Sequence, residues 1–148
     1  MAITVLLLSE NQTVSKELQA LLRKCSDFKV LFEADSREAA KLLQRITTVD
    51  VIVLDTQMPI LNGIAAAGTM KSRAADPPVI LLSLHMDARY VKASFSRGIA
   101  GYLLRESAYE ELPDAIRAVA GGDCYLSPQI MEKMPDEFIE EICRTNMG

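Results

Sequence analysis

The sequence predicts an α/β fold, a (βα)5 doubly wound parallel sheet with the strand order 2-1-3-4-5. Short apolar runs rich in β-branched residues alternate five times with segments of helical periodicity, which is the pattern of repeated β-α units. Three of these runs are apolar without alternation, as is typical of parallel strands buried on both faces. Strands that alternate with helices form a mostly parallel sheet with right-handed crossovers, and five strands are too few to close a barrel.

The expected strands are too short to be helices. They are residues 3–8, 28–32, 51–54, 79–84 and 101–104. The first helix carries an apolar stripe at Val14, Leu18, Leu21, Leu22 and Cys25, which would face the sheet. The next two helices are residues 36–46, with Ser36 as the N-cap, and the alanine-rich residues 64–72. The fourth helix, residues 87–97, ends at Gly98, a residue that commonly stops helices.

The last helix begins near Ser107 and ends at Gly121 and Gly122. Ser107 and Glu110 have the spacing of a capping box at a helix N-terminus. Pro113 conflicts with this start, because proline deep inside a helix costs ~3 kcal/mol. Either the helix begins nearer Leu112, with Pro113 in its first turn, or the first turn is distorted.

The 148-residue chain has an ordinary globular composition, with 49% hydrophobic and 24% charged residues. This excludes disordered and low-complexity chains. The formal net charge is −4, without a basic stripe, so we expect no nucleic acid to be bound by this chain itself. Uninterrupted apolar runs reach only four residues, and no basic segment precedes an apolar one at the start. We therefore expect no membrane association and a cytoplasmic location.

The three cysteines, Cys25, Cys124 and Cys143, include no C-x-x-C pair, and His85 is the only histidine. A disulfide framework and a zinc site are not expected, and reduced thiols are the preferred interpretation. His85 is interpreted as a rim or surface residue rather than a ligand, because no second ligand type accompanies it.

Polar residues stand where the expected strands end. Ser9 and Glu10 follow the first strand, Asp55 the third, Ser83 belongs to the end of the fourth, and Arg105 follows the fifth. The site of an open α/β sheet lies at the carboxyl ends of its strands, here between the first and third. One carboxylate there can act as a nucleophile, a second can hold Mg²⁺, and a hydroxyl and a cation can hold a phosphoryl group. Polar residues also end strands in proteins without such a site, so spacing alone leaves this open.

Residues 49–63, VDVIVLDTQMPILNG, resemble the phosphoacceptor segment of response-regulator receiver domains, in which an aspartate ends the third strand. Residues 79–83 resemble the strand that carries the switch hydroxyl, and residues 98–105 resemble the fifth strand with its switch aromatic. The resemblance covers about residues 3–122 and extends to the flavodoxin-like receiver fold. The sequences GYLL at 101–104 and GGDCYLSP at 121–128 look like the branch that precedes a helix-turn-helix DNA-binding domain.

The resemblance implies that Asp55 accepts a phosphoryl group from the phosphohistidine of a sensor histidine kinase. It assigns Mg²⁺ to Glu10, Asp55 and the backbone carbonyl of Gln57. Ser83 and Arg105 would hold the phosphoryl group. Ser83 and Tyr102 would form the switch that changes partner contacts, with a homodimer as the expected assembly. The domain is not expected to be an enzyme.

Two positions depart from the family pattern. The family has two adjacent acids after the first strand, where this chain has Ser9 and Glu10, and a lysine where it has Arg105. Loss of one carboxylate weakens a Mg²⁺ site, and a planar guanidinium does not replace a compact ammonium. Arg105 could instead pair with Asp55 or Glu10. The alternative function is therefore a degenerate receiver that acts by protein–protein contact without phosphorylation.

A third hypothesis keeps the fold but makes it an enzyme or a flavin protein. A flavodoxin-type site needs a glycine- and threonine-rich loop after the first strand, and residues 9–13 contain no glycine. A haloacid-dehalogenase-like phosphatase needs its aspartate where Ser9 stands. Because both motifs are missing, this hypothesis ranks below the two receiver hypotheses.

The domain expected from the sequence is a receiver at residues 1–122. Residues 123–148 are expected to be a tail or linker helices leading toward an output domain, and DNA would be bound only through such a C-terminal domain. Ser127 and Pro128 have the order of an N-cap and a first-turn proline that open a short helix. Two functional hypotheses therefore remain open from the sequence: a phosphoacceptor receiver and a degenerate receiver.

Overall fold

The computed structural model describes residues 2–9, 11–33, 49–55, 77–84, 87–96, 98–134, 136 and 139–140. Within this part the strands form one parallel six-stranded sheet in the order β2-β1-β3-β4-β5-β6. The strands are β1 (Ile3–Ser9), β2 (Phe28–Glu33), β3 (Val51–Asp55), β4 (Val79–Ser83), β5 (Gly101–Leu104) and β6 (Tyr125–Leu126). The predicted doubly wound parallel sheet is confirmed, with a sixth strand that was not expected.

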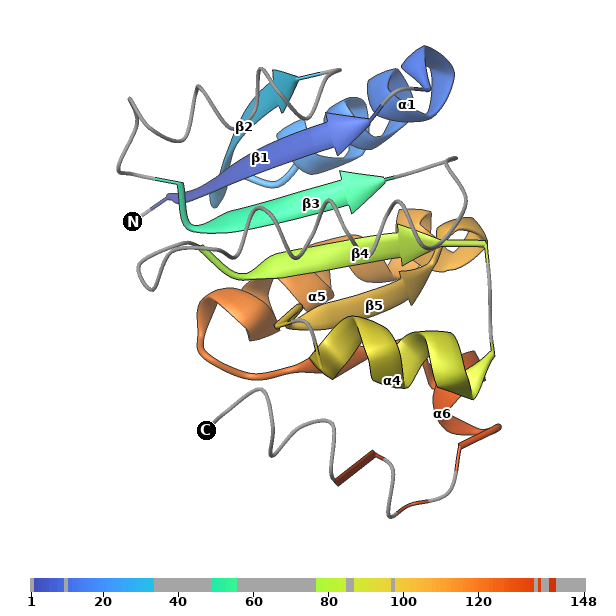
Figure 1. Cartoon of the computed structure of the whole chain (residues 1–148). Coiled ribbons are helices and arrows are strands. Elements are labelled where there is room, and N and C mark those ends of the chain that lie inside the picture. The colour runs from blue at the N-terminus through green and yellow to red at the C-terminus, as the bar shows by residue number, and fades with distance from the viewer. Residues whose placement is uncertain are drawn as a thin grey trace.

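The central strands are buried on both faces, as their unbroken apolar runs predict. All described residues of β3, β4 and β5 are buried. Because side chains alternate along a strand, β1 sends Leu6 and Leu8 into one core and Val5 and Leu7 into the other. Helix α4 covers the first core, whereas α1 and α5 lie on the opposite face of the sheet (Figure 1).

The described helices are α1 (Gln12–Arg23), α4 (Ala88–Ser96), α5 (Ala108–Ala120) and the single turn α6 (Pro128–Met131). Asn11 caps α1, its side-chain oxygen accepting a hydrogen bond from the Val14 amide at 3.1 Å. Gly98, with φ +97°, follows α4, so the predicted glycine stop is confirmed. The helices predicted at 36–46 and 64–72 lie outside the described residues.

The start of α5 differs from the predicted capping box. Ser107 precedes the helix, but its side chain makes no capping hydrogen bond; its hydroxyl instead accepts one from Gln129 at 3.1 Å. A 3-10 turn, η1 (Arg105–Ser107), leads into the helix, and Pro113 lies inside it. A start near Leu112 is therefore wrong. The buried side of α5 compensates for the proline, because burying one large apolar side chain contributes about 1.5–3 kcal/mol.

The polypeptide after α5 returns to the sheet. In β6 the Tyr125 amide donates to the Ala100 carbonyl at 3.0 Å, and the Ser127 amide donates to the Tyr102 carbonyl at 3.1 Å. Pro128 opens α6 as predicted. Ile130 is fully buried and Met134 nearly so, within the same core as α4. Residues beyond 122 thus contribute both a strand and core side chains.

The cysteines differ from the expectation of reduced thiols. Cys25 is free and partly buried, whereas Cys124 is disulfide-bonded. Cysteine spacing could not predict this, because pairing depends on which thiols the fold brings together. None of the helices in the described part of the chain has the length and apolar composition of a membrane-spanning segment.

Candidate functional site

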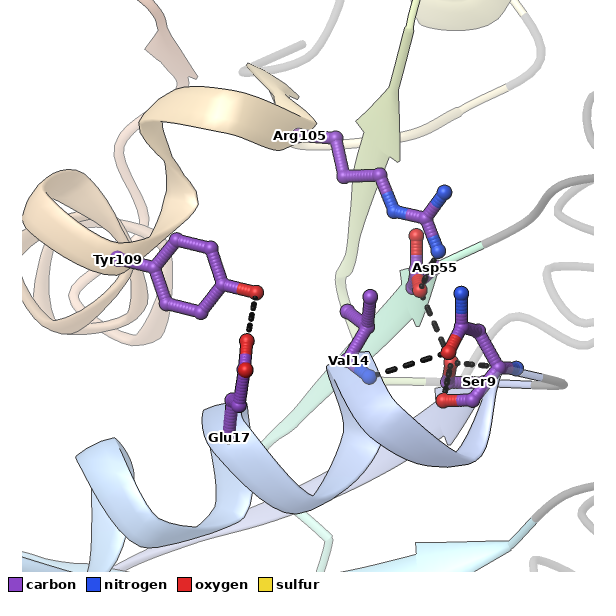
Figure 2. Close-up of polar contacts among 7 residues, drawn as sticks. Ser9, Val14, Glu17, Asp55, Arg105 and Tyr109 are labelled. Atoms are coloured by element: carbon purple, nitrogen blue, oxygen red, sulfur yellow. Dashed lines mark hydrogen bonds and ion pairs between the residues drawn. The ribbon is translucent and has the colours of Figure 1, made fainter.

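The carboxyl ends of four strands bring the predicted rim residues together. In the pairing of β1 with β3, Ser9 lies opposite Asp55. In the pairing of β4 with β5, Ser83 lies opposite Leu104, the residue before Arg105. A parallel arrangement places all these ends at one edge of the sheet. Figure 2 shows Ser9, Asp55 and Arg105 converging there above the first turn of α1.

The Asp55 carboxylate is buried, and its two oxygens have different surroundings. The residue is only 2% exposed. Its Oδ2 accepts hydrogen bonds from the Ser9 hydroxyl at 2.9 Å and from the Arg105 Nη2 at 2.9 Å. Its Oδ1 has no hydrogen-bond partner among the described residues. A buried oxygen in this position has lone pairs available to an incoming group.

The Ser9 hydroxyl is held in place by the start of α1. Its oxygen accepts a hydrogen bond from the Asn11 amide at 3.2 Å and lies 3.3 Å from the Asn11 carbonyl oxygen. A hydroxyl has a single proton to donate, and the shorter distance to Asp55 makes that carboxylate the better acceptor. Asn11 also caps α1. The first turn of the helix therefore aims Ser9 at Asp55.

Arg105 supplies the positive charge beside Asp55. The ion pair measures 2.9 Å, with the arginine side chain 12% exposed and the aspartate side chain fully buried. A buried carboxylate needs such a partner, because removing an isolated charge from water is very costly. The pairing of Arg105 with Asp55 that the sequence analysis offered is confirmed. Its alternative partner, Glu10, lies outside the described residues.

Ser83 and Tyr102, the predicted switch pair, are in contact with each other. Tyr102 is completely buried and Ser83 nearly so. Burial raises the pKa of the Tyr102 phenol above its ordinary value, a hydrogen bond from Ser83 counteracts this, and the negative charge of Asp87 adds to the rise. The Ser83 hydroxyl at the end of β4 and the Tyr102 phenol of β5 are therefore hydrogen-bonded to each other.

One polar contact near the site was missed by the sequence analysis. The Tyr109 hydroxyl on α5 donates to Glu17 on α1 at 2.5 Å (Figure 2). This hydrogen bond is the largest cause of the raised pKa of Tyr109. Among the smaller causes, the positive charge of Arg105 lowers the pKa and the negative charge of Asp55 raises it. The two residues are 92 positions apart, so no local pattern could have paired them.

Two predicted metal ligands, and a histidine that was interpreted as a rim or surface residue, belong to segments that the structure does not describe. Glu10, Gln57 and His85 lie outside the described residues. In the described part of the chain, no group of three histidine, cysteine, aspartate or glutamate side chains could hold a metal ion.

Comparisons with known proteins give the same fold and the same family. Residues 5–117 match the response regulator receiver domain family. Over 138 residues the chain is 31% identical to the response regulator UvrY of Escherichia coli K12, covering 93% of this chain and 63% of UvrY. It is 29% identical to the transcriptional regulatory protein DegU of Brevibacillus brevis, covering 92% of this chain and 58% of DegU. The chain thus spans about three fifths of the length of these relatives.

Solved structures agree. A two-component response regulator of the LuxR family from Aurantimonas sp. SI85-9A1 superposes with a TM-score of 0.82 at 24% identity, covering 94% of this chain and 99% of that one. The isolated REC domain of RcsB from Salmonella enterica serovar Typhimurium superposes with a TM-score of 0.79 at 20% identity, covering 88% and 97%. The family profile, the sequence relatives and the strand order lead to one conclusion: the chain belongs to the response regulator receiver domain family.

Proposed function

We propose that this chain is a phosphorelay receiver that accepts a phosphoryl group on Asp55 from the phosphohistidine of a sensor histidine kinase. The observation that carries the proposal is the buried Asp55 carboxylate at the end of β3, whose Oδ1 has no partner among the described residues. This oxygen forms the new bond to phosphorus, and the phosphorus–nitrogen bond of the donor breaks. Receiver domains of transcriptional regulators are generally not enzymes, and this transfer modifies the protein once rather than turning over a substrate.

Receiver domains generally bind Mg²⁺ at their acidic pocket, but the described residues of this site do not fit that ion. Mg²⁺ prefers oxygen ligands in near-octahedral geometry. Here Ser9 stands where the family has an acid, and Oδ2 of Asp55 is already bonded to the Arg105 guanidinium. A metal ion bound to Oδ2 would meet that positive charge. The remaining expected ligands, Glu10 and Gln57, lie outside the described residues.

Incubation with acetyl phosphate and Mg²⁺ is expected to add one phosphoryl group, and Asp55→Asn is expected to abolish the addition. The amide cannot form the acyl phosphate, because its nitrogen replaces a carboxylate oxygen. Intact-mass spectrometry measures the addition. Asp27→Asn is the matched control, since Asp27 is a partly exposed aspartate bound to Arg117, and this variant should be phosphorylated normally. Phosphorylation of Asp55→Asn would place the acceptor elsewhere.

A second candidate function is a degenerate receiver that acts by protein–protein contact. The Asp55–Arg105 ion pair favours it, because the resident guanidinium neutralises the acceptor carboxylate. In that case the wild-type mass stays unmodified after prolonged incubation with acetyl phosphate. The same experiment therefore separates the two functions.

The chain is further proposed to form a homodimer whose association surface is largely preset. Tyr102 is already completely buried, so a phosphoryl group has little left to rearrange at this end of β5. A ligand shifts an equilibrium only by its differential affinity for the two states. We expect beryllofluoride to change the dimer dissociation constant by less than about tenfold, or ~1.4 kcal/mol. Sedimentation at several concentrations tests this, and a monomer that dimerises only with beryllofluoride would contradict it.

The relatives suggest a place for this receiver in transcription regulation in the cytoplasm. DegU is named as a transcriptional regulatory protein, and the chain covers about three fifths of its length. We propose that residues 123–148 lead toward an output domain through which DNA is bound, with the receiver itself making no nucleic-acid contact.

A further inference from the structure

The two carboxylate oxygens of Asp55 differ in their hydrogen bonding. Oδ2 accepts two hydrogen bonds, one of them charge-assisted, while Oδ1 is buried with no partner among the described residues. Transfer to a carboxylate needs one oxygen to attack phosphorus and a positive charge to offset the negative charge that gathers at the site. The arrangement around Asp55 supplies both from the chain itself.

The guanidinium of Arg105 is suited to offset the negative charge that gathers during the transfer. It carries a permanent charge and five N–H donors in a rigid plane. Such a fork can hold the Oδ2 of Asp55 and an oxygen of the phosphoryl group together, because it binds carboxylates and phosphates in the same geometry. With its side chain only 12% exposed, Arg105 acts where charges are weakly screened by water.

The backbone that carries Arg105 is fixed on both sides by the C-terminal segment. The Leu104 amide donates to the Ser127 hydroxyl at 3.1 Å. The Gln129 side chain donates to the Ser107 hydroxyl at 3.1 Å. A group held in place before the reaction stabilises developing charge without reorganisation. The Arg105–Ser107 turn is therefore a preorganised support for the guanidinium.

From this geometry we infer that Arg105, positioned with Ser9 on Oδ2, takes the place of the divalent ion, so that Asp55 accepts a phosphoryl group without metal. The inference rests on the proposed phosphoacceptor function. With acetyl phosphate, Oδ1 forms the bond to phosphorus and the bond from phosphorus to the acetate oxygen breaks. Acetate leaves with that electron pair, no proton moves, and the total charge is unchanged.

The test measures phosphoryl incorporation from acetyl phosphate by intact mass, with excess EDTA or with Mg²⁺. The wild-type rates are expected to differ by less than about threefold, since the ion adds little charge stabilisation beyond that of the guanidinium. Arg105→Gln should slow incorporation in EDTA by about 100-fold, the usual cost of one lost charge-stabilising donor. Arg105→Lys keeps the charge but loses the planar fork and should lie between the two.

Arg117→Gln is the matched control, because Arg117 is an exposed arginine of α5 paired with Asp27; its rates should equal those of wild type. Circular dichroism establishes that each variant is folded. Incorporation by wild type only with Mg²⁺ would overturn the inference and leave the phosphoacceptor function standing. An unchanged rate for folded Arg105→Gln in EDTA would also overturn it. No incorporation in either buffer would overturn the proposed function as well.

Discussion

Replacing Arg105 with glutamine is expected to lower the free energy of unfolding by about 3 kcal/mol, because it leaves a buried carboxylate without its counter-charge. Asp55 has a fully buried side chain, so water cannot take over the role of the guanidinium. The Ser9 hydroxyl remains as a donor to Oδ2, but it carries no charge. Urea denaturation of wild type and variant measures the difference.

Two further variants separate this effect from general loss of an arginine. Arg117→Gln removes the exposed ion pair with Asp27 and the contact of the guanidinium with the Phe28 ring, and it should cost only about 1 kcal/mol, since exposed contacts of both kinds are weak. The double variant Arg105→Gln with Asp55→Asn should recover most of the loss, because removing both partners leaves no buried charge. Equal effects of the two single arginine variants would contradict the buried-charge argument.

The sequence predicted most of the sheet because hydrophobic pattern and burial agree there. Residues 51–54 and 79–82 are all apolar, and both strands are buried on both faces. β6 was missed since Tyr125–Leu126 is only two residues long, which is too short for a periodic pattern. The Ser107 capping box failed for a different reason. A tertiary contact with Gln129 engages that hydroxyl, and local patterns carry no information about such contacts.

The sequence predicted which residues of the described part lie at the site, but not how their side chains contact one another. Strand ends in a parallel sheet share one edge, so Ser9, Asp55, Ser83 and Arg105 could be placed together from the sequence. Which oxygen of Asp55 is bonded depends on the side-chain conformation of Arg105 and on the turn between β1 and α1. The contact of Tyr109 with Glu17 depends on how α5 packs beside α1. These are properties of packing, which residue spacing does not encode.

Replacing Ser9 with aspartate is expected to create a strong response to Mg²⁺ where wild type has little. The Ser9 oxygen lies 2.9 Å from Oδ2 of Asp55, so the new carboxylate and Asp55 could share one ion. Two carboxylates suit Mg²⁺ better than one carboxylate and a hydroxyl. At an ion concentration of about 100 times the dissociation constant, binding should stabilise the folded variant by about 2.7 kcal/mol.

The same variant should be sensitive to pH when the metal is removed. Arg105 balances one negative charge at the site, and a second carboxylate there has no cation of its own, so its pKa in the folded state lies above its unfolded value of about 3.9. A group with a raised folded pKa binds more protons in the folded state, and stability is lost as pH rises from the unfolded pKa through the folded one. Mg²⁺ reverses this loss, because it binds the ionised pair.

Ser9→Asn is the control for this prediction, since it has nearly the same shape as aspartate without the charge. Its melting temperature should respond to neither Mg²⁺ nor pH in the way that Ser9→Asp does. If Ser9→Asp gains no stability from Mg²⁺, the missing acid is not what limits metal binding, and the guanidinium on Oδ2 is. The double variant Ser9→Asp with Arg105→Lys then tests the guanidinium directly. A compact ammonium leaves more of the Asp55 carboxylate accessible than a planar guanidinium does, so the double variant should bind Mg²⁺ where the single variant does not.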